Sequence, residues 1–253
     1  MKPRGDIMLN KHVEYKKIVD GADKAVLFIH GIMGTPNHFK NLIPLVPDNY
    51  SAYAMVTAGH CGTVDDFSNA SLEKWEASVQ KSVDELLETH KELYLVGHSM
   101  GTLFSIEQAM KEPRIKKLFC ISIPIKVGVR GRMIPMALKV YRNRIRDDDI
   151  YARALKECYG VTDSKNIFKY LGWIPRFLDL FKLIKRVRSK LGELHTPCVA
   201  YQSIPDELVS PKSIDILNRE SNIRVEVLNN STHMYYDPDE MDYLKKEFIK
   251  FLE

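Results

Sequence analysis

The stretch Leu93-Tyr-Leu-Val-Gly97-His-Ser99-Met-Gly101-Thr-Leu-Phe-Ser-Ile-Glu-Gln-Ala-Met110 decides how the rest of this chain is interpreted. Its apolar start predicts a buried strand, and the pattern after Gly101 predicts a helix. Between them stands Gly-x-Ser-x-Gly, a motif that presents a serine on a tight turn from strand to helix. In such a turn, side chains at Gly97 and Gly101 would collide with neighbouring backbone. We therefore predict that Ser99 is a nucleophile; a plain glycine-rich turn is the structural alternative.

A serine hydroxyl stays protonated at neutral pH, so a base must accept its proton and an acid must orient that base. Two later loops supply candidates for both roles. Asp206 and Glu207 follow the strand-like run from Cys198 to Gln202, and His233 follows the last strand-like run. Both loops lie past the carboxyl ends of predicted strands, on the same sheet edge as Ser99. The residues alone leave Asp206 and Glu207 as competing acids for His233.

Acyl transfer also needs donors for a developing oxyanion, and fixed backbone N–H groups serve best. The first apolar strand ends in His30-Gly-Ile-Met-Gly-Thr-Pro36, whose glycines let the chain fold back toward the sheet edge. We assign the amides of Ile32 and Met100 to this oxyanion hole. His30 and His60 are interpreted as histidines that shape loops, and His98 is expected to point away from the attacking oxygen.

Short apolar runs alternate with helical patterns along the chain, which is typical of a parallel sheet with crossover helices. The helical stripe from Leu72 to Leu87 has Ser71 as its expected N-cap, and a similar stripe from Met241 to Leu252 predicts a C-terminal helix. The fold class is therefore α/β, with a mostly parallel central sheet flanked by helices. The expected strands are 25–30, 53–56, 93–97, 117–122, 198–202 and 224–228.

Residues 124–192, here called the cap segment, break this alternation because they contain several short helical patterns and no clear strand. We expect them to form a helical cap, or lid, inserted into a core made of residues 1–123 and 193–253. The cap segment contains 17 Lys and Arg but only 6 Asp and Glu, whereas the whole chain has a net charge of +4. Its apolar residues exceed what a small helical cluster can bury, so some should line a substrate pocket. The residues expected there are Met33, Ile134, Trp173 and Phe177.

The composition excludes several classes of protein. The chain has 253 residues, of which 45% are apolar and 28% charged, so it can form a core, and disordered or low-complexity classes are excluded. No apolar run approaches a membrane span and the first residues lack a secretory signal, so a cytoplasmic location is expected. The cysteines are too scattered for a disulfide framework, and Cys120 and Cys198 are interpreted as core residues. No cluster has the spacing of metal ligands, so no metal is predicted.

Taken together, the quoted motifs at His30–Pro36 and Gly97–Gly101, with Asp206-Glu-Leu-Val-Ser-Pro211 and Ser231-Thr-His233, resemble bacterial α/β-hydrolases of the carboxylesterase and monoacylglycerol-lipase type. The resemblance spans nearly the whole chain and is weakest in the cap segment. It implies a Ser99–His233–Asp206 triad in the order that this family uses, an acyl-enzyme intermediate and no cofactor. It favours Asp206 as the acid and leaves Glu207 to face solvent or begin a helix. Cys61 departs from the family, because relatives commonly have glycine there.

The expected substrate is a small ester with an apolar acyl group, either a short- to medium-chain ester or a monoacylglycerol. A peptidase or thioesterase of the same fold is the alternative, and so is a non-catalytic protein that binds a small ligand on this scaffold. No nucleic-acid partner is expected. The basic cap segment suggests weak association with an anionic membrane surface, although solvated Lys and Arg side chains would have the same composition.

Overall fold

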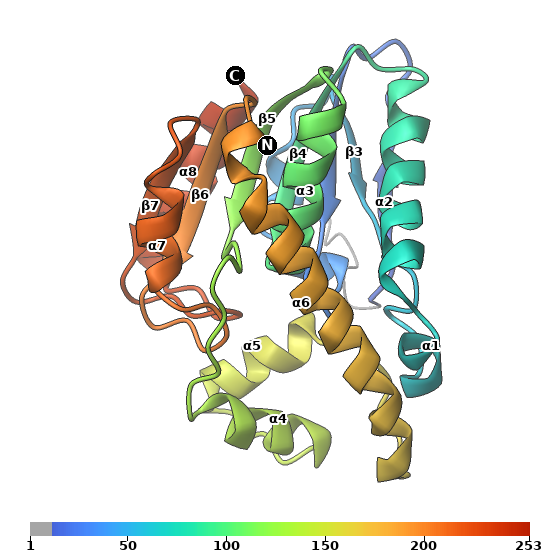
Figure 1. Cartoon of the computed structure of the whole chain (residues 1–253), viewed down its shortest axis with the longest axis vertical. Helices are drawn as coiled ribbons and strands as arrows, with labels where there is room; N and C mark the ends of the chain where they lie inside the picture. Colours follow the sequence, from blue (N-terminus) through green and yellow to red (C-terminus); the bar gives the residue numbers. More distant parts are fainter. Residues whose placement is uncertain (1–11) are drawn as a thin grey trace, which may run out of the picture.

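The computed structural model describes residues 12–253, and these form a seven-stranded sheet with helices on both faces (Figure 1). The strands lie in the order β1-β3-β2-β4-β5-β6-β7. Strand β1 runs antiparallel to β3 at one edge, and the other neighbours are parallel. Their bounds are β1 (Tyr15–Lys17), β2 (Lys24–Ile29), β3 (Ser51–Ala54), β4 (Glu92–His98), β5 (Ile115–Ile121), β6 (Cys198–Ser203) and β7 (Ile223–Leu228).

The predicted α/β architecture, a mostly parallel sheet flanked by helices, is confirmed, and a strand forms at each of the six expected places. Two details differ. Strand β3 occupies residues 51–54, two residues before the expected 53–56, because its pairing with β2 selects part of a longer apolar run. Strand β1 was not predicted, since three residues are too few to show a period.

The helices follow the expected pattern, and α2 begins directly after Ser71, whose hydroxyl accepts a hydrogen bond from the Lys74 amide. The α-helices are α1 (Val64–Ser68), α2 (Leu72–Leu87), α3 (Met100–Lys111), α4 (Met133–Tyr141), α5 (Ile150–Cys158), α6 (Ile174–Ser189), α7 (Lys212–Leu217) and α8 (Pro238–Leu252). Short 3₁₀ helices are η2 (Pro36–Phe39), η3 (Ile43–Leu45), η4 (Ile167–Trp173) and η5 (Leu191–Glu193).

The core consists of one apolar cluster on each face of the sheet. Trp75 and Val79 of α2 pack with Leu103 of α3 on one face, and Phe248 of α8 packs with Phe28 on the other. These side chains leave water almost completely, and their burial is the main favourable term in folding. Cys120 and Cys198 lie in this core as predicted, and all four cysteines are free. The sheet is thus covered on both faces, and only its edges and strand ends remain for a site.

The cap segment contributes α4, α5, η4 and α6, and no strand of the sheet. Figure 1 shows α4 and α5 below the sheet, whereas α6 runs diagonally from that end up along α3. Leu183 and Val187, in the second half of α6, join the core cluster that contains α2 and α3. One helix therefore serves both the expected cap and the expected core. The division of the chain at residues 124 and 192 stays a prediction.

Candidate active site

Ser99 lies on a strained turn between β4 and α3. Its backbone has φ +49° and ψ −121°, in a region that side chains disfavour. A Cβ at Gly101 would lie 1.9 Å from the carbonyl oxygen of Ile29, and one at Gly97 would lie 2.7 Å from the Thr102 backbone, so the predicted steric need for both glycines is confirmed. The turn is held because the Ser99 amide donates to Ile121 O at 2.9 Å, and the Thr102 hydroxyl donates to Ser99 O at 2.6 Å.

The loops after β6 and β7 bring Asp206 and His233 together. His233 Nδ1 lies 2.8 Å from Asp206 Oδ2, and the other oxygen of this carboxylate accepts the amides of Leu208 and Val209 at 2.7 and 2.8 Å. Burial raises the pKa of Asp206, but the charge of His233 and these hydrogen bonds outweigh it, so that the pKa is lowered overall. An ionised Asp206 requires the His233 proton on Nδ1. The other ring nitrogen, Nε2, is then the basic one.

His98 connects the turn that carries Ser99 to the loop that carries His233. The His98 ring lies 4.8 Å from the His233 ring, and His98 Nε2 donates to the backbone oxygen of His233 at 3.1 Å. On its other side the His98 ring stacks at 3.4 Å on His38, which in turn bonds Tyr236. Burial lowers the pKa of His98 well below its usual value, so it is neutral in the folded protein. The contact brings the Ser99 turn and the His233 loop together.

Glu207 does not have the expected position. Its side chain is 1% exposed, and Oε2 accepts the backbone N–H of His233 at 3.0 Å. Its Oε1 pairs with Nε of Arg132 at 2.7 Å. The prediction that Glu207 faces solvent or begins a helix is therefore wrong, because the turn at Asp206 directs both neighbouring carboxylates toward the His233 loop. Arg132 was missed altogether, and no local pattern could have paired it with a residue 75 positions later.

The glycine-rich loop after β2 lies against the Ser99 turn. A Cβ at Gly31 would lie 2.9 Å from Ser99 Cβ, so only glycine permits this approach. His30 Nδ1 donates to Gly31 O at 2.8 Å while its Nε2 accepts the Thr57 amide at 3.1 Å, which confirms a loop-shaping role. Among the described residues, the amides of Ile32 and Met100 donate to no other protein group. They remain available to a ligand beside Ser99.

Two other predictions about this rim are explained by the backbone. His60 Nδ1 donates to Ala58 O at 3.2 Å, and its ring packs against Phe67 and Trp75, as a loop-shaping histidine should. Cys61 has φ +58°, a conformation that glycine adopts at least cost. The glycine that the family resemblance leads us to expect at this position would suit this left-handed backbone, which the present chain forms with a cysteine.

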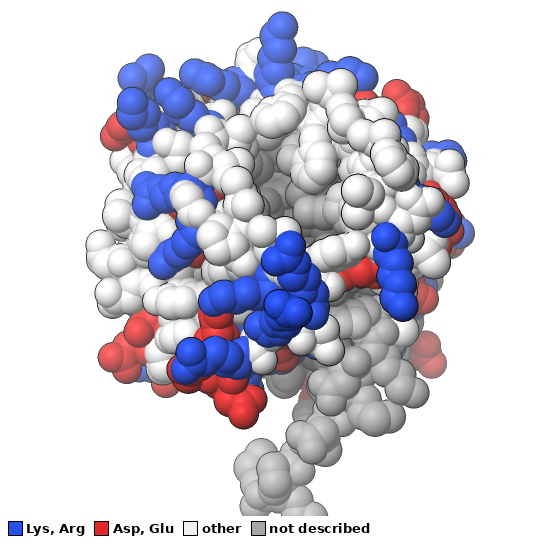
Figure 2. All heavy atoms as spheres, turned by 90° about the horizontal axis from the view of Figure 1, so that it is seen from below, with Lys and Arg blue, Asp and Glu red and all other residues white. Residues whose placement is uncertain are grey.

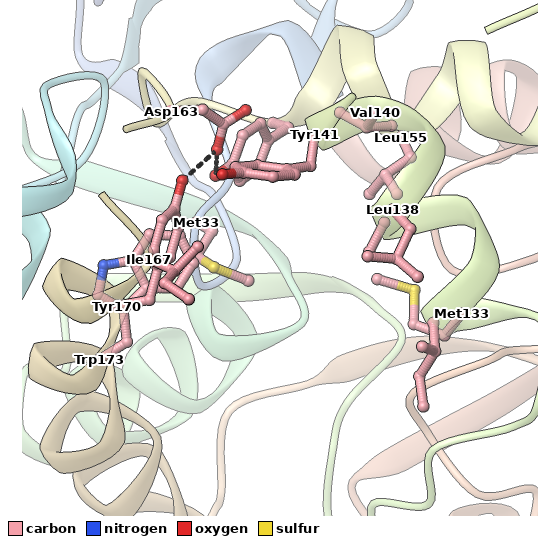
Figure 3. Close-up of a pocket in the computed structure, with 13 residues that line it drawn as sticks. Met33, Met133, Leu138, Val140, Tyr141, Leu155, Asp163, Ile167, Tyr170 and Trp173 are labelled. Carbon is pink, nitrogen blue, oxygen red and sulfur yellow. Dashed lines mark hydrogen bonds between the residues drawn. The ribbon is translucent and has the colours of Figure 1, made fainter. Parts of the chain in front are cut away.

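A cavity of about 460 Å³ lies between the cap segment and the loop after β2 (Figure 3). Three of the four expected pocket residues, Met33, Ile134 and Trp173, line it, whereas Phe177 is not among the lining residues. Asp163 is its one charged lining residue and accepts the hydroxyls of two tyrosines that also line it. The remaining lining residues are Met133, Ala137, Leu138, Val140, Tyr141, Leu155, Tyr159, Ile167 and Tyr170.

Met33 belongs to both the cavity wall and the loop of the free amides. It has φ +54°, and its carbonyl oxygen accepts the Gly160 amide of the cap segment at 2.9 Å. The cavity therefore begins one residue from Ile32. Within residues 12–253, no group of three or more His, Cys, Asp or Glu side chains has a metal-binding arrangement. In the same range no helix is both long and apolar enough to cross a membrane.

Comparison with known proteins agrees with this geometry. A family model described as the alpha/beta hydrolase family matches residues 26–241. A carboxylesterase of Bacillus subtilis (strain 168) is 22% identical over 242 residues, which cover 92% of this chain and 94% of that protein.

Solved structures show the same fold. One from a report on the metagenome-derived lipolytic enzymes LipS and LipT has a TM-score of 0.73 at 21% identity and covers 95% of this chain and 98% of its own. A monoacylglycerol lipase of Paleococcus ferrophilus has a TM-score of 0.65 at 17% identity and covers 94% and 97%. Since the family model spans most of the chain, including the Ser99 turn and the loops of Asp206 and His233, this protein belongs to the alpha/beta hydrolase family.

Proposed function

We propose that this protein is a serine hydrolase that cleaves carboxylic esters through an acyl-enzyme, with Ser99, His233 and Asp206 as its triad. The observation that carries the proposal is the 2.8 Å bond from His233 to Asp206, made beside a strained serine and two free amides. This combination supplies a nucleophile, an oriented base and oxyanion donors, which are the three requirements of acyl transfer.

In the proposed reaction, His233 Nε2 takes the proton of Ser99 while Oγ attacks the ester carbonyl carbon. The carbonyl oxygen becomes negative and accepts the amides of Ile32 and Met100. His233 then gives the proton to the alcohol oxygen as the C–O bond breaks, which leaves an acyl group on Ser99. Water repeats the attack with His233 as base, and the carboxylic acid leaves. Asp206 stays ionised and stabilises the imidazolium that forms in each half.

The cavity supports short- to medium-chain acyl esters or monoacylglycerols as substrates. Its wall is almost entirely apolar, and it begins at Met33, one residue from the proposed oxyanion donor Ile32. An acyl chain placed there would gain about 0.8 kcal/mol for each buried CH₂. The same site could act on thioesters, so a matched pair of oxygen and sulfur esters of equal acyl length should be compared. We infer oxygen esters as the main class.

A serine-reactive fluorophosphonate probe tests the triad directly. We expect the probe to label wild type and Ser105→Ala but not Ser99→Ala. Ser105 is a suitable control because it is a buried serine of α3 whose hydroxyl donates to Gly101 O. Hydrolysis of p-nitrophenyl esters from two to twelve carbons should fall with Ser99→Ala and His233→Ala, and the double variant should be little worse, because triad members act as one unit. Full labelling of Ser99→Ala would refute the proposal.

We further propose that the cap face attracts anionic esters or an anionic lipid surface. Many of the large apolar side chains that stay exposed belong to the cap segment, including Ile134, Ile167, Phe168, Leu171 and Ile174. Figure 2 shows this end of the molecule with a hollow among uncharged residues and Lys and Arg side chains around it. Such an arrangement combines apolar contact with attraction to negative headgroups.

Vesicle sedimentation tests the charge role. Reversal of the exposed Arg142, Arg144 and Arg146 to Glu should weaken binding to phosphatidylserine vesicles at low salt and leave phosphatidylcholine binding unchanged. Reversal of Lys91, directly before β4, and Lys116, at the start of β5, is a control, because the Ser99 turn follows the other end of β4. If the arginine and lysine reversals weakened vesicle binding equally, the basic side chains of the cap segment would have no specific role in binding and would only interact with water.

A further inference from the structure

The carboxylate of Glu207 is buried next to the catalytic loop that the mechanism needs, yet the proposed chemistry does not use it. It accepts the backbone N–H of His233 at 3.0 Å, and its side chain is 1% exposed. A buried charge without a partner is expensive, so the cation that neutralises it determines whether this arrangement is stable. That cation is Arg132, which reaches Glu207 Oε1 from the cap segment at 2.7 Å.

Arg132 precedes α4, contacts the acid loop directly and reaches the His233 loop through intermediate residues. Its Nη2 donates to Pro205 O at 2.8 Å, directly before the acid Asp206. Its guanidinium lies 4.8 Å from the ring centre of Tyr151 in α5, and that ring meets Tyr235 edge-on at 5.1 Å. Tyr235 O in turn accepts the amide of Thr232 at 2.7 Å, the residue before His233. Arg132 therefore joins two cap helices to the acid loop and to the base loop.

The backbone reinforces this connection. The Arg130 amide donates to Glu207 O at 2.8 Å, and the Gly128 amide donates to Leu208 O at 2.9 Å. Val127 and Val209 form an antiparallel bridge in the same place. The start of the cap segment is thus paired along the loop that carries Asp206 and Glu207, so a shift of the cap would move Arg132 and this loop together.

We propose that Arg132 and Glu207 are positioning residues, a charge pair through which the cap segment aligns His233 and balances the electric field at its ring. The inference rests on the proposed function, because it gives His233 the role of base. Glu207 acts on the backbone of His233, and Arg132 acts through Glu207. Neither residue touches the reacting atoms in this scheme.

The surroundings of His233 make the effect of each charge predictable in sign. His38 and His98 face it from η2 and the Ser99 turn. Burial lowers the pKa of His38 to about 3 and that of His98 well below its usual value, so both rings are neutral at neutral pH. Burial raises the pKa of Tyr236 well above its usual value, so it is neutral too. Glu240 of α8 holds the loop at Ser231 and is unchanged in every variant below. Among residues 12–253, the charges that these variants change or depend on are then those of Asp206 at the imidazole, of Glu207 at the His233 backbone and of Arg132 behind Glu207.

Removing the positive charge of Arg132 leaves two carboxylates beside the imidazolium and stabilises it. The acid limb of the pH profile, where kcat/KM rises as the base loses its proton, should then move to higher pH in Arg132→Met. Removing the negative charge with Glu207→Gln leaves Arg132 in excess, and the limb should move to lower pH. A single charge that acts on the imidazole across a partly buried site predicts a shift of the acid limb of about one pH unit in each variant. A purely structural role would lower kcat without moving the limb in opposite directions.

The experiment measures kcat/KM for p-nitrophenyl butyrate up to pH 9, and down to the lowest pH at which circular dichroism shows each protein folded. The proteins compared are wild type, Arg132→Met, Glu207→Gln, the double variant and Arg132→Lys. The double variant should return the limb to its wild-type position. Arg132→Lys should also return it, because lysine restores the charge, but should keep a reduced kcat, because it cannot reach both Glu207 and Pro205 O. Arg130→Met is the matched control. The side chain of Arg130 is exposed and forms no ion pair among the described residues, so this variant should behave as wild type.

The outcomes separate the two proposals. If Ser99→Ala keeps its activity, the proposed function fails first. If Ser99→Ala is inactive and the single variants share the wild-type acid limb, or shift it in the same direction, the positioning pair is refuted while the triad stands. If Arg132→Met does not fold because Glu207 is left unpaired, Glu207→Gln and the double variant still decide the question, since neither contains a buried unpaired carboxylate.

Discussion

Acidification should unfold this protein early, because four buried histidines are held neutral around the site. Burial lowers the pKa of His30 to about 4 and that of His38 to about 3, and it lowers the pKa of His60 and of His98 well below the usual value of 6.5. The bonds of His30 show the physical reason. Its Nε2 accepts the Thr57 amide, so a proton placed there would set two donors against each other.

The sign follows from proton binding. Below pH 6.5 these histidines bind protons in the unfolded chain but not in the folded protein. The free energy of unfolding therefore decreases as the pH is lowered. The stabilisation is complete above pH 6.5, and the loss ends only near the folded pKa values of about 3 to 4. At pH 5.5, His30 and His38 each lower the free energy of unfolding by about 1.4 kcal/mol, or about 3 kcal/mol together, and His60 and His98 lower it further. A domain is typically stable by about 5–15 kcal/mol, so we expect acid unfolding near pH 5.

Urea denaturation followed by circular dichroism at pH 8 and pH 5.5 measures this loss. His38→Phe keeps the stacking on His98 but gives up the bond to Tyr236, so it should be less stable at pH 8 by about 1 kcal/mol. Its loss between the two pH values should nevertheless be about 1.4 kcal/mol smaller than that of wild type, since one titrating group is gone. A wild-type loss below about 2 kcal/mol, or an unchanged loss in His38→Phe, would refute the reasoning.

Three further predictions concern the turn, the cavity and metals. Gly101→Ala should fail to give soluble protein, or lose more than about 3 kcal/mol in urea denaturation, because its Cβ would lie 1.9 Å from Ile29 O; stability within 1 kcal/mol of wild type would contradict the geometry. Ala137→Phe should fill part of the cavity and lower kcat/KM for decanoate esters about tenfold relative to acetate esters, with Ala137→Ser as control; equal effects on both esters would place the acyl chain elsewhere. EDTA should leave ester hydrolysis unchanged, and inhibition that zinc or calcium reverses would reveal a metal site.

The amino-acid sequence by itself determined the class of fold and the identity of the chemical candidates. Strands such as Glu92–His98 and helices such as Leu72–Leu87 were predictable because their periods and caps are local properties of the chain. Ser99, Asp206 and His233 could be proposed because a tight glycine turn and two strand ends restrict where such groups are useful. The approach of His233 to Asp206 at 2.8 Å agrees with that reasoning.

Only the tertiary structure decided the features that depend on distant contacts. The three residues of β1 become a strand only by pairing with β3, and the bounds of β3 are set by its pairing with β2. The two halves of α6 have different surroundings because Leu183 and Val187 belong to the core cluster, whereas Ile174 and Leu178 stay exposed. Arg132 and Glu207 lie 75 residues apart; in sequence Arg132 looks like an ordinary surface charge, and Glu207 like a second candidate acid or a solvent-facing carboxylate. Their pairing depends on the path of the cap segment, because a buried carboxylate is stable only where the fold brings a cation to it.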